Sequence, residues 1–175
     1  MADHGKGNSV SDKKPSRPEG LVEDTADFYN RLAYDYDRLF AYSSVTTRVQ
    51  STWLKLRLRK GLVLDLGCGT GRMIKPLKQK GFRLVGLDCA DQMLAVARAR
   101  YPDAALVYGD ACQALPFEDA SFDNVISLHA SVIHATGWPD LQVMSQEVLR
   151  VLKPKGRFVV ECPPPRTYPS QDETI

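Results

Sequence analysis

Apolar residues near the amino terminus recur at intervals of three and four positions. Between Asp24 and Leu58 this spacing is that of one helix face, and its members are Phe28, Leu32, Leu39, Val45, Val49, Trp53 and Leu56. The pattern predicts two amphipathic helices that are separated near residues 42–44. Leu54, Leu56 and Leu58 also alternate with basic residues as in a strand, so the end of the second helix stays open.

Beyond Gly61 the pattern changes to short β-rich runs that alternate with helical spacing. We expect strands at 62–66, 82–87, 104–108, 124–128 and 157–161, and helices at 72–80, 91–100 and 140–152. Strands that alternate with helices form parallel sheets through right-handed crossovers. The sequence therefore predicts an α/β fold with a doubly wound, mostly parallel sheet of five strands, whose ligand lies at the carboxyl ends of the strands.

The chain has room for one ordinary domain, because it contains 175 residues. Residues 1–22 are polar and rich in Gly, Ser, Lys and Pro, which predicts a disordered tail. We place the domain at residues 23–165 and a second polar tail at 166–175. No apolar run resembles a signal peptide or approaches the length of a membrane span, which predicts a cytoplasmic protein.

Charge and cysteine content exclude several classes of site. The net charge of +2 is too small for a dedicated nucleic-acid binder, and the basic stretch Lys55, Arg57, Arg59 and Lys60 is typical of a solvated helix end. Four cysteines stand at positions 68, 89, 112 and 162 without a paired C-x-x-C spacing. We therefore expect reduced thiols, no disulfide framework and no metal site.

The segment Val63–Gly71 (VLDLGCGTG) is a buried strand that runs directly into a glycine loop and then a helix. Glycines permit a tight turn and a close approach of the backbone to a ligand, and the free N–H groups of a helix start can bind it. The dinucleotide fingerprint G-x-G-x-x-G fails, because its last position holds Arg72 and the third glycine is Gly71. The loop predicts a nucleoside cofactor rather than a pyrophosphate.

Asp88 follows the next strand, in the segment Leu84–Asp88 (LVGLD). A carboxylate at that place can accept hydrogen bonds from both ribose hydroxyls of a nucleoside above the glycine loop. The alternative is that Asp88 caps the following helix. Asp91 is the better candidate for that cap, because the apolar run Met93, Leu94 and Val96 comes after it.

From about Phe28 to Cys162 the chain resembles the class I S-adenosylmethionine-dependent methyltransferases, especially the small-molecule group that includes the ubiquinone and menaquinone biosynthesis enzymes. The resemblance is carried by DLGCGTG at 65–71, Asp88, GDA at 109–111, LPF at 115–117, SFDNVI at 121–126 and EVLRVLKP at 147–154. It implies a Rossmann-like methyltransferase fold, S-adenosylmethionine as cofactor and a small-molecule acceptor.

The resemblance also implies roles for particular residues. The loop Gly67, Cys68 and Gly69 would lie beneath the methionine part of the cofactor, Asp65 would approach its amino group, and Asp88 would hold the ribose.

Further contacts are implied for the adenine and the methionine amine. Asp110 and the N–H of Ala111 would recognise the adenine, Cys89 and Met93 would flank its ring, and the carbonyls of Ser127 to His129 would contact the amine. Asp110 is also a common turn residue beside Gly109, so the alternative of a purely structural role stays open.

Aromatic residues in the leading helix give the last cofactor candidates. Tyr29 and Tyr36 resemble the rings that cover the methionine end in these enzymes, and an aromatic face attracts a sulfonium cation. The alternative is that both rings pack the helix against the sheet.

Catalysis requires alignment of the acceptor, the methyl group and the sulfur more than any particular catalytic group. His129 and His134 follow the fourth strand and are the candidates for a general base. The small-molecule relatives often carry a His-His pair here, whereas this chain has His134-Ala135. The turn at 153–156 reads KPKG in place of the common KPGG, which a turn tolerates if Lys155 avoids positive φ.

The fold implied by the resemblance continues with two further strands, which we expect to be missing here, so the fifth strand would have an open edge. Three hypotheses follow. The first is an active small-molecule methyltransferase. The second is a non-catalytic module that binds the cofactor and engages a second copy or a partner protein at the open edge. The third is an RNA or protein methyltransferase.

Overall fold

Five parallel strands form one sheet in the computed structural model, which describes residues 25–40, 44–128 and 138–161. The strands are β1 (Leu62–Leu66), β2 (Arg83–Asp88), β3 (Ala105–Tyr108), β4 (Phe122–Ser127) and β5 (Leu152–Val160). Their order is β3-β2-β1-β4-β5, so the winding reverses between β1 and β4 at the centre of the sheet. The predicted doubly wound parallel sheet of five strands is confirmed.

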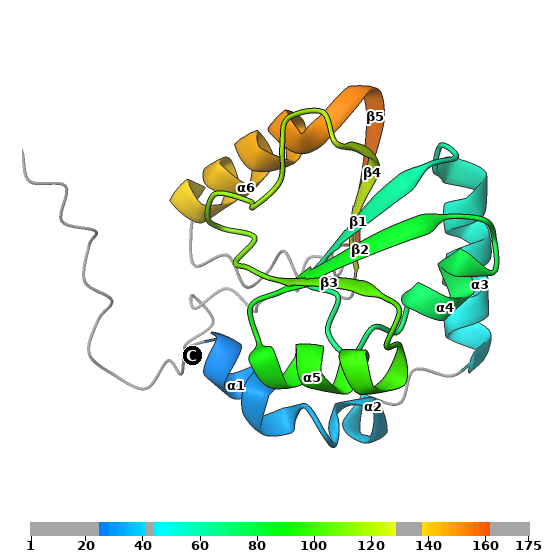
Figure 1. The fold of residues 1–175 in the computed structure, drawn as a ribbon, viewed down its shortest axis with the longest axis vertical. Coiled ribbons are helices and arrows are strands. Elements are labelled where there is room, and N and C mark those ends of the chain that lie inside the picture. Colours follow the sequence, from blue (N-terminus) through cyan, green and yellow to red (C-terminus); the bar gives the residue numbers. More distant parts are fainter. Residues whose placement is uncertain (1–24, 41–43, 129–137, 162–175) are drawn as a thin grey trace, which may run out of the picture.

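Helices cover both faces of this sheet. They are α1 (Thr25–Leu32), α2 (Tyr36–Leu39), α3 (Ser44–Arg57), α4 (Ile74–Lys78), α5 (Asp91–Arg100) and α6 (Trp138–Val151). In Figure 1, α6 lies on one side of the sheet, while α4 and α5 lie on the other and α1 runs beside α5. None of the helices in the described ranges has the length and apolar character needed to cross a bilayer.

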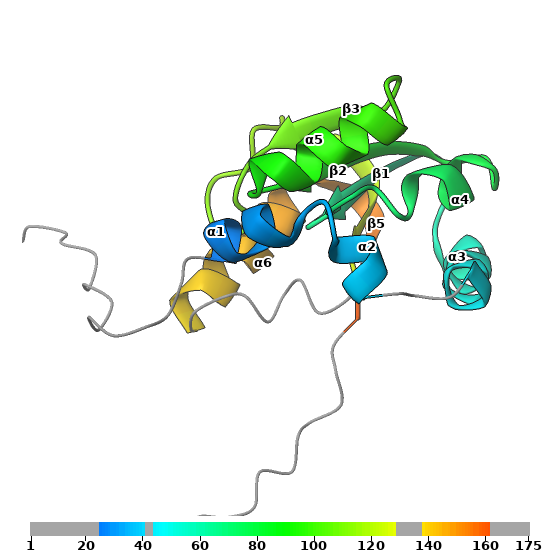
Figure 2. The same ribbon diagram turned by 90° about the horizontal axis from the view of Figure 1, so that it is seen from below.

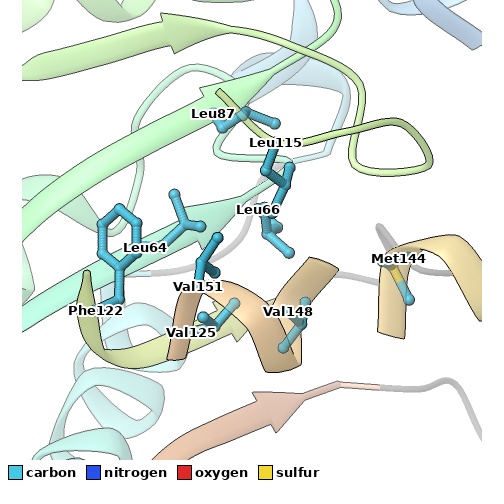
Figure 3. Close-up of a cluster of buried hydrophobic side chains, with 9 residues drawn as sticks. All are labelled: Leu64, Leu66, Leu87, Leu115, Phe122, Val125, Met144, Val148 and Val151. Carbon is cyan, nitrogen blue, oxygen red and sulfur yellow. The ribbon is translucent and has the colours of Figure 1, made fainter. Parts of the chain in front are cut away.

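Alternation along β1 divides the core between the two faces. Leu64 and Leu66 point toward α6, where they pack with Val148 and Val151 in the cluster that Figure 3 shows. Val63, from the same strand, packs with α3 and α4 on the opposite face. Because both faces are covered, β1 is buried almost completely, as its apolar sequence predicts.

The amino-terminal region differs from the prediction, because the described part contains three helices instead of two. The additional break lies between Leu32 and Tyr36, where the N–H of Asp35 donates to the Leu32 carbonyl at 2.9 Å. Ala33 is buried at this bend against Ala90 and Met93. The small side chain lets the chain turn closely over α5, which a hydrophobic period cannot reveal.

The open question at the end of the second predicted helix is settled in favour of the helix. Leu54 and Leu58 are buried, whereas Leu56 is 77% exposed. Residues four apart share a helix face, while alternate residues share a strand face. Burial therefore follows the helical period, and α3 continues to Arg57.

The fifth strand begins five residues earlier than predicted, at Leu152. Its pairing with β4 shifts between Phe122 and Asn124, so the KPKG segment forms an irregularity inside the strand instead of a turn before it. Lys155 has φ +64° there. The condition that Lys155 avoids positive φ is therefore not met, and a lysine occupies a conformation that favours glycine.

Candidate functional site

The glycine loop after β1 forms the tight turn that its sequence predicts. Gly67, Gly69 and Gly71 have φ values of +71°, +54° and +78°, all in the left-handed region that disfavours residues with a Cβ. A Cβ built on Gly69 would meet no atom within 4 Å, so only the backbone conformation requires glycine there. The same openness leaves room for a ligand against the loop.

The loop is held against the end of β2. The N–H groups of Gly67 and Cys68 both donate to the Leu87 carbonyl, at 2.8 and 3.0 Å. Cys68 lies over Gly86, where a Cβ would come within 2.7 Å of the Cys68 Sγ atom. Gly86 thus makes the space in which the buried thiol of the loop packs against β2.

Asp88 joins the glycine loop to the start of α5. Its Oδ2 atom accepts from the Gly69 N–H at 2.7 Å and its Oδ1 atom from the Ala90 N–H at 2.9 Å. The side chain is buried at the carboxyl end of β2, and the backbone N–H of Cys89 also hydrogen-bonds to it. The position suits the predicted ribose contact, which stays a prediction.

The expectation that Asp91 caps α5 is wrong. Ala90 occupies the N-cap position and makes no side-chain cap hydrogen bond, and Asp91 is the first helical residue. The carboxylate of Asp88 instead binds the backbone just before the helix. Asp88 therefore lies where a ribose contact is expected and also binds the backbone at the start of α5, which is part of the capping role given as its alternative.

A second buried carboxylate, Asp65, lies near Asp88 at the end of β1. Burial, followed by the negative charge of Asp88, raises the pKa of Asp65 to about 7, and the charge of Arg72 opposes this shift. Burial also raises the pKa of Asp88, although the N–H groups of Ala90 and Gly69 counteract it. Two buried acids at the base of the loop can stabilise a cation, because a positive ligand compensates charge that burial disfavours.

Burial also controls the chemistry of the loop cysteine. It raises the pKa of the Cys68 thiol, and the nearby carboxylates of Asp65 and Asp88 raise it further. A neutral, buried thiol is a packing group instead of a nucleophile.

The segment after β3 shows a turn at the predicted adenine position. Asp110 is exposed, and its Oδ1 atom accepts from the Cys112 N–H at 2.8 Å. Ala111 packs partly against the core beneath α6. The structure thus shows the turn role of Asp110, and the adenine contacts of Asp110 and Ala111 stay predictions.

Tyr29 and Tyr36 lie on the amino-terminal helices, over the first turn of α5. Their rings meet edge to face with centroids 5.9 Å apart, and both pack against the cluster of Ala33, Ala90 and Met93. These contacts agree with the core-packing alternative for the two tyrosines. Met93 is buried in this cluster, while Cys89 is half-buried beside it in sequence.

The end of β4 supplies the remaining candidates. The Ser127 carbonyl accepts from the Glu161 N–H at 2.9 Å, which links β4 to the end of β5. Its proposed contact with a methionine amine would use the second lone pair. His129 and His134 lie outside the described residues.

Three residues that the sequence reasoning missed meet at the glycine loop. Asp37 of α2 accepts from the hydroxyl of Thr70 at 2.8 Å and from the guanidinium of Arg100 at 2.6 Å. The only signal in the sequence is the position of Thr70 between two glycines of the motif. Nothing in the sequence pattern pairs it with Asp37, which lies 33 residues away.

Comparison with known proteins agrees with this geometry. A family model described as a methyltransferase domain matches residues 63–156. Demethylmenaquinone methyltransferase of Thermotoga maritima is 35% identical over 146 residues, which are 79% of this chain and 62% of that enzyme.

Two solved structures show the same fold. DesVI of Streptomyces venezuelae superposes with a TM-score of 0.66 and 27% identity, over 74% of this chain and 56% of its own. A SAM-dependent methyltransferase of Thermotoga maritima gives a TM-score of 0.60 and 27% identity, over 77% of this chain and 59% of its own. The chain thus spans about three fifths of the length of these proteins, and it belongs to the class I S-adenosylmethionine-dependent methyltransferases.

Proposed function

We propose that this chain binds S-adenosylmethionine and transfers its methyl group to a small organic acceptor. The observation that carries the proposal is the pairing of a loop with three left-handed glycines, open at Gly69, and two buried acids, Asp65 and Asp88, at the ends of adjacent strands. An open backbone surface suits a nucleoside, and buried negative charge suits a ligand with positive groups.

The residues of this site fit the cofactor. When bound, it supplies an activated methyl group on a positively charged sulfur. Asp88 would hold the ribose, while Asp65 would lie closest to the positive groups. The remaining task of the protein is to orient the acceptor and exclude water, which requires position more than acid–base chemistry.

The acceptor class is supported by the relatives. The Thermotoga maritima relative is named for a quinone acceptor, demethylmenaquinone. The net charge of this chain is only +2, which provides no strong field for RNA. Both observations favour a small molecule over a nucleic acid.

Titration calorimetry with Asp88→Asn tests the cofactor site. The wild-type chain should bind S-adenosylmethionine, and the variant should bind about tenfold or more weakly, because one charged acceptor is lost. Asp91→Asn is the matched control, since Asp91 is exposed three residues away and should leave the affinity unchanged. A wild-type chain that binds neither the cofactor nor its demethylated product would contradict the proposal.

Turnover separates catalysis from binding alone. The proposal expects methyl transfer to at least one member of a panel of small phenols, quinols and amines. Binding without turnover across the panel, together with self-association, would favour the non-catalytic module. In that case the outer edge of β5, where Phe158 and Val160 are partly exposed, is the predicted contact.

A further inference from the structure

We propose that Asp37 is a positioning residue that fastens the two amino-terminal helices to the glycine loop and so holds them over the cofactor. This inference rests on the proposed function, because it assigns the loop to the cofactor's methionine side. α1 and α2 are here called the cap. Figure 2 shows the cap lying along α5, with α2 turned toward the side where α4 lies.

The first attachment of the cap is a three-residue junction at the loop. The Thr70 hydroxyl donates to Asp37 Oδ1 at 2.8 Å, and Arg100 Nη2 donates to Asp37 Oδ2 at 2.6 Å. Arg100 Nη1 also reaches the Thr70 carbonyl at 3.4 Å. One carboxylate therefore binds the glycine loop and the last turn of α5 together, with charge-assisted bonds that are stronger than neutral ones.

Burial makes the bond to Thr70 the specific part of this junction. Thr70 is only 2% exposed, whereas the side chains of Asp37 and Arg100 are 38% and 39% exposed. A half-exposed ion pair contributes little, because water and salt screen it. The Thr70 hydroxyl is shielded from water, so its bond to Asp37 is screened less than the ion pair is.

The second attachment of the cap lies at the opposite end of α5. Asn30 Oδ1 accepts from the Gln92 N–H at 2.9 Å, and the Tyr34 hydroxyl donates to the Gln92 side chain at 3.2 Å. Tyr34 and Gln92 are exposed and Asn30 is half-buried, and these bonds attach α1 and the bend after it to the first turn of α5. Without Asp37 the cap would stay attached to α5 through these bonds and through the packing of Tyr29, Ala33 and Tyr36, but α2 would lose its hydrogen bond to the loop.

The junction acts on the same backbone as Asp88. Thr70 follows Gly69, whose N–H donates to Asp88, and precedes Gly71. Tyr36, the neighbour of Asp37, packs over Ala90 and Met93. Asp37 therefore connects the loop, the acid at the end of β2 and the ring that would cover the ligand.

Exchanges at Thr70 test the inference with little change in volume. Thr70→Val removes the hydroxyl at nearly constant size, and Thr70→Ser keeps it. We expect Thr70→Val to weaken S-adenosylmethionine binding about tenfold, because a charge-assisted hydrogen bond is lost. Thr70→Ser should bind the cofactor like the wild type. Asp37→Ala removes the acceptor and should resemble Thr70→Val. Asp35→Ala is the control, because Asp35 pairs with exposed Arg38 on the same cap.

Two further readouts distinguish positioning from general destabilisation. 5′-Methylthioadenosine lacks the amino-acid part of the cofactor, so its affinity should change by no more than about twofold in Thr70→Val, as for independent sites. Hydrogen exchange of the α2 amides, measured without ligand, should become about tenfold faster in Thr70→Val and stay unchanged in Thr70→Ser.

Each other outcome overturns the inference. Unchanged exchange and unchanged affinity in Thr70→Val would contradict the fastening. If Thr70→Val lost affinity equally for S-adenosylmethionine and for 5′-methylthioadenosine, the junction would contribute to general stability and not to positioning. A wild-type chain that binds neither nucleoside would contradict the proposed function together with the positioning role, whereas a wild type that binds, with variants that match it, would contradict this inference alone.

Discussion

Gly61 illustrates a residue whose replacement is blocked by a specific neighbour. A Cβ there would lie 2.1 Å from Asp123 Oδ2, and that carboxylate is held by the Leu62 N–H at 2.8 Å and by Lys153 at 3.0 Å. We predict that Gly61→Ala lowers the free energy of unfolding by about 2–3 kcal/mol, since the positive φ and the overlap add. Urea denaturation measures the loss.

The matched control for this prediction is Gly81→Ala. Gly81 has φ +87°, but a Cβ there would meet no atom within 4 Å. Only the conformational cost applies, so we expect a loss of about 1 kcal/mol. Equal losses at the two positions would show that the overlap with Asp123 relaxes at no cost.

Lys155 provides the opposite case, because it already occupies a conformation that favours glycine. Its φ is +64°, and its side chain is exposed. Lys155→Gly should raise the free energy of unfolding by about 0.5–1 kcal/mol, as relief of the left-handed strain exceeds the added chain entropy. The same exchange at exposed Lys60, which lacks positive φ, should stabilise nothing. A stabilisation at both sites would refute the conformational explanation.

At the scale of elements, α6 holds the segment between β3 and β4. Arg150 donates to the carbonyls of Leu115 and Phe117 and to Glu147, while Glu147 accepts from the Leu115 N–H at 2.7 Å. Arg150→Met would leave these acceptors without their donor, so we predict a loss of about 2–3 kcal/mol in urea denaturation. Asp119→Asn should cost less than about 1 kcal/mol, because Asp119 is 79% exposed.

The contacts of Glu147 with Arg150 and Leu115 predict a dependence of stability on pH. The hydrogen bond from Arg150, assisted by the Leu115 N–H, lowers the pKa of Glu147 from 4.5 to about 2. A depressed pKa stabilises the folded state above pH 4.5, and this contribution disappears as the pH falls toward 2. The difference in unfolding free energy between wild type and Glu147→Gln should therefore shrink across this range. A constant difference would contradict the assignment.

Elements were predictable where burial follows a regular period. The range of α5 was predicted from its apolar spacing and that of β1 from its continuous apolar run, because both elements present their whole pattern to the core. α2 and the early start of β5 were not predicted. Four residues are too few to show a period, and the irregularity at Lys155 arises from pairing with β4, which lies outside its local sequence.

At the scale of the whole molecule, the sheet brings distant motifs to one edge. Asp65, the glycine loop and Asp88 were predictable as a site because each lies at the carboxyl end of a parallel strand, and strand ends meet at the switch point. The junction of Asp37, Thr70 and Arg100 was not predictable. Its members come from three elements, and side-chain geometry, not sequence spacing, brings them together.

The buried acids give the assembled site a pH dependence of its own. Burial and the charge of Asp88 raise the pKa of Asp65 from 3.8 to about 7, while Arg72 opposes the shift. Because the pKa of Asp65 is raised, the folded protein without ligand keeps a proton between pH 3.8 and about 7 that the unfolded chain releases. The contribution of Asp65 to stability is therefore present below pH 3.8 and is lost as the pH rises through about 7.

A cationic cofactor reverses this penalty, because it favours the ionised form of Asp65. We predict that the affinity for S-adenosylmethionine rises about tenfold between pH 6 and pH 8, as one proton is released on binding. In Asp65→Asn this rise should disappear, whereas Asp91→Asn, exposed and remote from the loop, should keep it. Calorimetry at pH 6, 7 and 8 measures the dependence, and repetition in buffers of different ionisation enthalpy counts the proton. If Asp65→Asn kept the full slope, the proton would belong to another group, and Asp65 would not face the cofactor's positive charge.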